Sequence, residues 1–100
     1  MYTIIERRKV NRARVQETEQ AAQGGATSKL RTAAGFVGFS LVEDTGEGVN
    51  TQIVVWESKA HADAFQQDAD SWNRTLDGHG HRLESANRGE TVIHVEPQKS

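Results

Sequence analysis

Two β-prone segments in the middle of the chain carry apolar side chains on both of their faces. Successive side chains of a strand point to opposite sides of a sheet. The apolar positions are Val37, Phe39 and Leu41 against Phe36 and Val42 in residues 35–43, and Ile53 and Val55 against Val54 and Trp56 in residues 52–57. A sheet that contains these strands therefore needs a cover on each face, and this constrains the fold more than any other feature.

The flanking segments predict further strands and helices in the order β-α-β-β-α-β. Residues 2–10 predict a first strand, and Asn11 is a suitable N-cap for a helix that runs to about residue 33 and tolerates two glycines at 24–25. The glycine-rich residues 44–48 predict a hairpin turn between the central strands. A second helix follows Ser58 and carries apolar side chains at spacings of 3, 4, 3 and 4: Ala62, Phe65, Ala69, Trp72 and Leu76. Residues 91–95 predict the last strand, which Pro97 ends.

This order is that of the α+β, ferredoxin-like fold, in which two helices lie on one face of an antiparallel sheet. Two helices cover only one of the two apolar faces, and the other would expose a patch on the order of several hundred Å². We therefore expect a homodimer through the sheet face; cover by loops or by the C-terminal tail is the alternative. The 100 residues predict one domain, 1–100, with 1–96 folded and 97–100 a frayed tail.

Composition excludes several classes of partner and site. The net charge of −2 gives no basic excess for nucleic acid or for an anionic membrane. The absence of cysteine excludes a disulfide framework, a thiolate zinc site and a cysteine nucleophile, and it fits a cytoplasmic location. No apolar run approaches the roughly 18 residues of a membrane span, and the N-terminus predicts no signal peptide.

His79 and His81, separated by one glycine, are the first candidates for chemistry. In an extended segment their rings would point the same way, about 7 Å apart. A neutral imidazole is the usual general base near pH 7 and a ligand for metal ions and heme iron. We take His79 as a catalytic candidate and His81 as a substrate-binding candidate; a solvated helix end is the alternative. Two histidines alone make no zinc site, so no metal is expected.

An arginine and four aromatic residues complete the candidate site. Arg7 could stabilise an enolate or phenolate oxygen from the first strand, although a solvated strand end is the alternative. Trp56 is the third catalytic candidate, as a pocket wall or an indole N–H donor, with core packing as its alternative. Phe36, Phe65 and Trp72 are candidates to line a pocket for a small, flat aromatic ligand, and the same side chains could instead form core.

The ordered set of these motifs resembles the antibiotic biosynthesis monooxygenase (ABM) domain family. The motifs are the segment 35–39, the segment 54–58 and a helix that carries Ala64 and Phe65, and the resemblance spans nearly the whole chain. It implies a dimeric α+β barrel. It also implies a monooxygenase that oxidises aromatic, polyketide-like substrates without a bound cofactor, in which the substrate's own carbanion reacts with oxygen in a dry pocket.

A weaker resemblance points to the IsdG-type heme-degrading enzymes. It implies His79 as the heme-iron ligand, an Asn on the first strand and a Trp on the second helix. Here Arg7 stands at the Asn position and Phe65 at the Trp position, so one of the three elements fits. The sequence therefore leaves three functions open: a cofactor-free monooxygenase, a heme-binding or heme-degrading protein, and a non-catalytic small-molecule-binding dimer.

Overall fold

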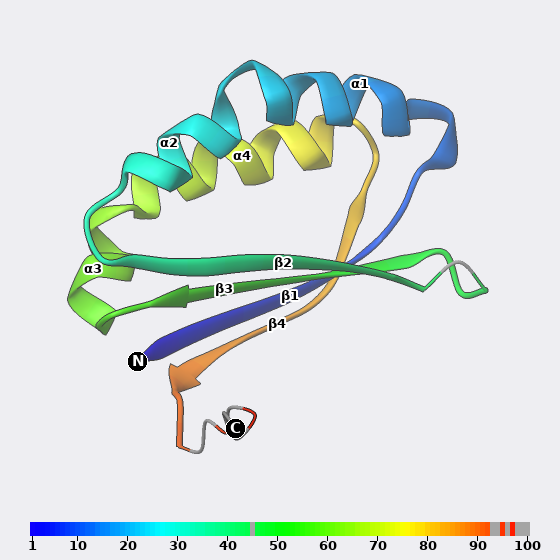
Figure 1. Cartoon of the computed structure of the whole chain (residues 1–100). Helices are drawn as coiled ribbons and strands as arrows, with labels where there is room; N and C mark the ends of the chain where they lie inside the picture. The colour runs from blue at the N-terminus through cyan, green and yellow to red at the C-terminus, as the bar shows by residue number, and fades with distance from the viewer. Residues whose placement is uncertain (45, 93–94, 96, 98–100) are drawn as a thin grey trace.

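In the computed structural model, one antiparallel sheet carries all the helices on one of its faces (Figure 1). The structure describes residues 1–44, 46–92, 95 and 97. The strands are β1 (Tyr2–Lys9), β2 (Phe36–Asp44), β3 (Val49–Trp56) and β4 (Arg82–Glu90), in the spatial order β2-β3-β1-β4. This confirms the α+β, ferredoxin-like prediction.

The first helical arm is less regular than the single helix predicted over residues 12–33. It consists of a 3₁₀ turn η1 (Arg12–Arg14), the helix α1 (Val15–Ala21), a π-helical segment η2 (Ala22–Ala26) and the helix α2 (Thr27–Thr32). The Asn11 side chain accepts a hydrogen bond from the Ala13 N–H, as expected of an N-cap. The arm is π-helical rather than α-helical around Gly24 and Gly25, where each glycine weakens an α-helix by about 1 kcal/mol relative to alanine.

The second helical arm begins where it was predicted to begin. The Ser58 hydroxyl caps it by accepting a hydrogen bond from the His61 N–H at 3.2 Å. A turn at Phe65 divides the arm into α3 (Lys59–Ala64) and α4 (Gln66–Gly78). Ala62 and Leu76, from the predicted apolar stripe, are buried.

The predicted last strand is wrong in its position. The strand β4 ends at Glu90 and pairs with β1 along its length, whereas Thr91 and Val92 follow it outside any strand. Residues 93–94 and most of the predicted 97–100 tail lie outside the described residues. The segment of β4, RLESANRGE, has no β-branched residue, so its strand conformation comes from pairing with β1 rather than from intrinsic propensity.

A bulge in β2 changes which side chains face the helices. The pairing of β2 with β3 shifts register between Phe36 and Gly38. Phe36 then packs against Trp56 while Phe39 points into the space under the helices, although simple alternation places these two rings on opposite faces. The core cluster of Tyr2, Trp56 and Ala62 forms at this end of the sheet.

In the described part of the chain, no helix lies on the second face of the sheet (Figure 1). The side chains on it include Ile5, Val42, Ile53 and Val55, of which Ile5 and Val42 are exposed. Among the described residues, no helix is both long enough and apolar enough to span a membrane.

Candidate functional site

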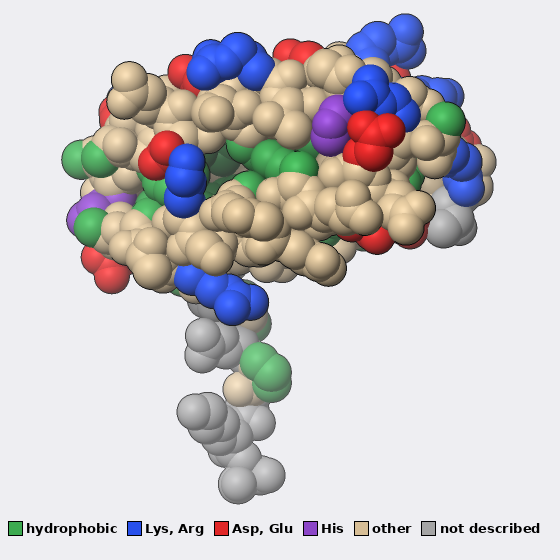
Figure 2. Space-filling view, turned by 90° about the horizontal axis from the view of Figure 1, so that it is seen from above, with side chains coloured by type: hydrophobic (Ala, Val, Ile, Leu, Met, Phe, Trp, Pro, Cys, Tyr) green, Lys and Arg blue, Asp and Glu red, His purple; other side chains and the backbone are tan. Residues whose placement is uncertain are grey.

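A cavity of about 340 Å³ lies between the two helical arms and the sheet. Seen from the helical side, apolar side chains are visible at the bottom of a hollow between the arms (Figure 2). Its volume falls within the range of about 300–1,000 Å³ that is typical of small-molecule sites. The cavity is therefore the candidate site.

The floor of the cavity changes from apolar to polar along β1 and β3. The directly opposed residues on this face of the two strands are, in order, Tyr2 with Trp56, Ile4 with Val54, Glu6 with Gln52, and Arg8 with Asn50. Apart from Tyr2, all of them line the cavity. A ligand in the cavity would therefore meet an apolar end and a polar end.

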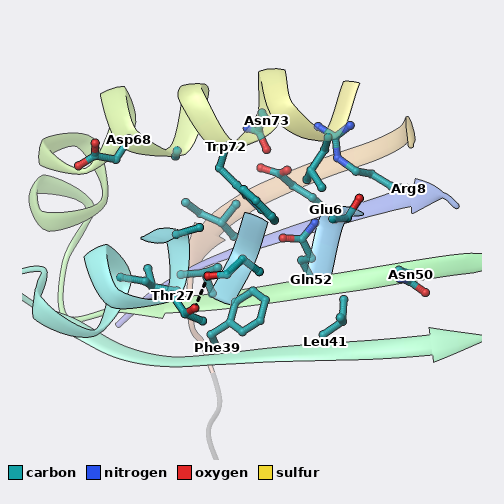
Figure 3. Close-up of a pocket in the computed structure, with 18 of the residues that line it drawn as sticks. Glu6, Arg8, Thr27, Phe39, Leu41, Asn50, Gln52, Asp68, Trp72 and Asn73 are labelled. Atoms are coloured by element: carbon teal, nitrogen blue, oxygen red, sulfur yellow. Dashed lines mark hydrogen bonds between the residues drawn. The ribbon is translucent and has the colours of Figure 1, made fainter. Parts of the chain in front are cut away.

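Aromatic rings form much of the apolar end. Trp56 is buried, and its ring centroid lies 5.2 Å from that of Phe65. Trp72 projects from α4 toward the sheet, and Phe39 reaches in from β2 (Figure 3). The structure thus brings the predicted residues Trp56, Phe65 and Trp72 to one cavity. The predicted Phe36 does not line it; its ring packs edge-on against Trp56, with the centroids 5.9 Å apart.

Arg8 dominates the polar end. Its side chain is only 4% exposed, and one terminal nitrogen, Nη1, donates to Asp77 Oδ1 and to the carbonyl oxygen of His81, both at 2.7 Å. The Nε–H of the same side chain is buried and has no hydrogen-bond partner in the described part of the chain. Asn50 Oδ1, on the residue directly opposite, is buried and unpartnered in the same way. Buried polar groups are normally paired, so these two atoms mark a place where a ligand could bind.

His81 lies in the cavity wall and is buried. Its Nδ1 accepts the Asn11 N–H at 3.0 Å, so the proton of the neutral ring resides on Nε2, which lies 2.6 Å from the Thr18 hydroxyl. Burial lowers the pKa of His81 below its ordinary value, and the neighbouring His79, Arg8 and Arg14 lower it further. His81 is therefore neutral at pH 7. Its hydrogen bonds to Asn11 and Thr18 link the first helical arm to the start of β4.

His79 lies outside the cavity lining. Its Nδ1 is 2.7 Å from the Thr18 hydroxyl, and its Nε2 is 4.0 Å from Glu17 Oε2. The segment is not extended as expected, because Gly80 turns the chain with a φ of 80°, but both rings reach the Thr18 hydroxyl and their centroids lie 6.2 Å apart. A direct catalytic role for His79 stays a prediction without support from its position.

Arg7 is exposed and lies on the face of β1 away from the helices, where it is opposite Thr51 and Ser85. The arginine that reaches the cavity is its neighbour Arg8, which sequence reasoning missed. The alternation of side chains along β1 could have identified Arg8, because it shares a face with Tyr2 and Ile4. By the same alternation, Asn50 and Gln52 share a face with Trp56.

The comparisons with known proteins agree with this architecture. The family model described as antibiotic biosynthesis monooxygenase matches residues 1–71. The chain belongs to this family. No curated protein matches the sequence.

Solved structures from the ABM family share the fold at low sequence identity. A candidate ABM protein from Deinococcus radiodurans superposes with a TM-score of 0.77 at 12% identity, over 99% of this chain and 100% of the other. One from Nitrosomonas europaea gives a TM-score of 0.70 at 12% identity, over 93% and 100%. One from Bordetella bronchiseptica gives 0.67 at 20% identity, over 92% and 97%. These likenesses establish the fold alone.

Neither His79 nor His81 of this ABM chain fits as a heme ligand in the cavity. An axial ligand needs a free imidazole nitrogen directed into the pocket. His81 has both nitrogens engaged, and His79 lies outside the cavity with its Nδ1 at the Thr18 hydroxyl. Within the described residues, no group of three His, Asp or Glu side chains is placed to hold a metal ion.

Proposed function

We propose that this ABM-family protein is a small-molecule monooxygenase that oxidises a flat aromatic substrate with O₂ and without a bound cofactor. One observation carries the proposal: the cavity combines an aromatic wall with a buried arginine, Arg8, whose Nε–H has no partner within the described protein. A substrate ring would lie against Trp72 and Phe65, and a phenolic or enolic oxygen would accept the hydrogen bond of Arg8.

The chemistry that this arrangement supports begins with loss of a hydroxyl proton from the substrate. Glu6, two residues before Arg8 on the same face of β1, is the candidate base. Arg8 Nε–H stabilises the resulting oxyanion, and the apolar walls exclude water from the carbanion form. All four electrons that reduce O₂ come from the substrate. One oxygen atom bonds to a ring carbon, the O–O bond breaks, and the other oxygen leaves as water, so that a ring C–H becomes a carbonyl.

Oxygen uptake with a panel of anthrones, phenols and hydroquinones tests the proposal, and adjacent arginines provide a matched pair of variants. Arg8→Lys keeps the charge but removes the Nε–H donor, and we expect it to lower kcat about 100-fold, the typical effect of losing an oxyanion donor. Arg7→Lys changes the opposite face and should leave kcat unaltered. No turnover by the wild type across the panel, or full activity in Arg8→Lys, would contradict the proposal and favour a non-catalytic binding protein.

We further propose that the protein acts as a homodimer through the helix-free face of its sheet. Ile5 lies directly opposite Ile53 there, and Val42 and Val55 extend the apolar surface onto β2 and along β3. Burial of apolar surface is the main driving force for association, and a second copy offers a cover of matching chemistry.

A further inference from the structure

The floor of the cavity continues from the inner strands β1 and β3 onto β2, which is an edge strand of the sheet. Two adjacent rows of directly opposed side chains cross these three strands, and all six side chains line the cavity. In order from β1 to β2, the rows are Ile4, Val54 and Phe39, and then Glu6, Gln52 and Leu41. The first row is apolar across its whole width, and the second changes from a carboxylate to an apolar side chain. An apolar track of Ile4, Val54, Phe39 and Leu41 therefore leads from the inside of the cavity to the edge of the sheet.

The outer end of the apolar track is open to solvent. Phe39 is 40% exposed and Leu41 is 56% exposed, although both side chains rise from β2 on the helix side of the sheet (Figure 3). The proposed homodimer would cover the opposite face of β2, where Val42 lies, and would leave these two side chains uncovered. Contiguous exposed apolar surface at the rim of a cavity is typical of a ligand-binding groove.

The width of the two rows indicates the length of the ligand that they would hold. Neighbouring strands lie about 4.8 Å apart, so the Cα atoms of Glu6 and Leu41 are separated by about 10 Å across β3. A phenol whose hydroxyl group lies at Glu6 is shorter than this distance, so its ring would leave Leu41 uncovered. An apolar chain on the ring would cover it. The exposed carboxylate of Glu43, the next residue of β2 that lines the cavity, disfavours a negative charge at the end of such a chain.

We propose that the cavity binds an aromatic ligand that carries an uncharged alkyl side chain. The ring lies beneath Trp72, which projects from α4 toward the sheet (Figure 3). The chain crosses β3 at Val54 and ends on Phe39 and Leu41 at the edge of the sheet. This inference rests on the proposed function for the position of the hydroxyl group at Glu6, and it adds that the apolar track determines the preference for the alkyl chain.

Calorimetric titration of the full chain with four para-substituted phenols tests the inference. The probes are 4-ethylphenol, 4-butylphenol, 4-hexylphenol and 4-octylphenol. We expect the Kd to fall about twofold for each added methylene group up to the hexyl chain, since a fully buried methylene gives about fourfold and the open rim buries each one only in part. The gain should then level off, because the sheet ends at β2. Equal affinity across the series, no binding of any probe, or a gain that continues undiminished to the octyl chain would overturn the inference without the need for a variant.

Two neighbouring residues of β2 provide a matched pair of variants that assign the chain to one face of the sheet. Leu41→Asn removes the outer end of the apolar track and should weaken the binding of 4-hexylphenol about fivefold, while 4-ethylphenol binds as before. Val42→Asn changes a side chain of similar exposure, 54%, on the opposite face and should leave both affinities unaltered. A preference for the hexyl chain that survives Leu41→Asn, or that is lost in Val42→Asn, would overturn the assignment. A shift of Leu41→Asn from dimer to monomer in analytical ultracentrifugation would also overturn it, since a second copy of the chain would then cover Leu41.

Oxygen uptake measured in parallel with the panel of anthrones, phenols and hydroquinones separates the two proposals. Turnover of the panel without a chain-length dependence of the Kd rejects only this inference. A chain-length dependence of the Kd without turnover rejects only the monooxygenase.

Discussion

At the scale of single residues, the polar side chains around Thr18 connect the first helical arm to the end of α4 and the start of β4. The Thr18 hydroxyl lies within hydrogen-bond distance of His79 Nδ1, His81 Nε2 and the Arg14 carbonyl oxygen. If both rings donate to Thr18, its own proton goes to Arg14, and every group in the cluster is satisfied. The two histidines thus support the cavity wall rather than supply free ring nitrogens to a ligand.

Removing that hydroxyl should destabilise the fold. Thr18→Val keeps the shape of the side chain but leaves the two imidazole N–H groups without their acceptor, and we expect a loss of about 1–3 kcal/mol in the free energy of unfolding. Urea denaturation measures it. Thr32→Val, on the exposed end of α2, removes only a hydroxyl bonded within its own helix and should change the free energy by less than about 0.5 kcal/mol.

The depressed pKa of His81 predicts a loss of stability in mild acid. The folded protein holds His81 neutral below the pKa that the ring has in the unfolded chain, so the unfolded state binds the proton first. The stabilisation is complete above the unfolded-state pKa of about 6.5 and decreases as the pH falls from there toward the folded-state pKa. Unfolding free energies at about pH 7.5 and about pH 5.5 should differ in this direction, and His81→Gln should reduce the difference. An unchanged pH dependence in His81→Gln would contradict this role.

At the scale of elements, the sequence predicted those helices and strands that neighbouring residues in the chain specify. The Ser58 cap, the apolar stripe of the second arm and the two faces of β3 all follow from spacing and side-chain chemistry. The structure confirms the cap and the stripe, and it places Val54 and Trp56 on the cavity side of β3. The strand β4 has no such local signal, because its strand conformation comes from pairing with β1. The bulge in β2 was equally hidden, because it depends on how β2 registers against β3. The bulge decided that Phe39 rather than Phe36 lines the cavity. Arg8, by contrast, was missed although the local alternation of β1 places it on the same face as Tyr2 and Ile4.

The turn between α2 and β2 depends on a single glycine. Gly35 has a φ of 77°, and a Cβ atom there would overlap the ring of His61 on α3. Gly35→Ala should therefore cost more than about 2 kcal/mol of unfolding free energy, through both backbone strain and overpacking. Gly24→Ala is the matched control, because a Cβ atom at Gly24 meets no other atom within 4 Å. Equal melting temperatures for the two variants would show that this turn does not depend on Gly35.

At the scale of the whole molecule, the proposed homodimer makes a direct prediction. Ile53→Glu places a charge in the centre of the apolar face, and it should shift the protein from dimer to monomer in analytical ultracentrifugation, since an unpaired buried charge opposes association strongly. Glu57→Lys, which changes a charge at an exposed position just beyond β3, should leave the dimer intact. A wild-type chain that sediments as a monomer at high concentration would rule out the sheet-face dimer.

The central claim is that an aromatic ligand binds under the helices with an oxygen at Arg8. Nitrogen-15 NMR of the arginine Nε–H groups tests it most directly, because Arg8 and Arg7 are neighbours on opposite faces of one strand. On titration with a hydroquinone from the oxygen-uptake panel, we predict that the Arg8 Nε–H resonance shifts downfield while that of Arg7 does not change. An unchanged Arg8 resonance at a ligand concentration that saturates calorimetric binding would contradict the account.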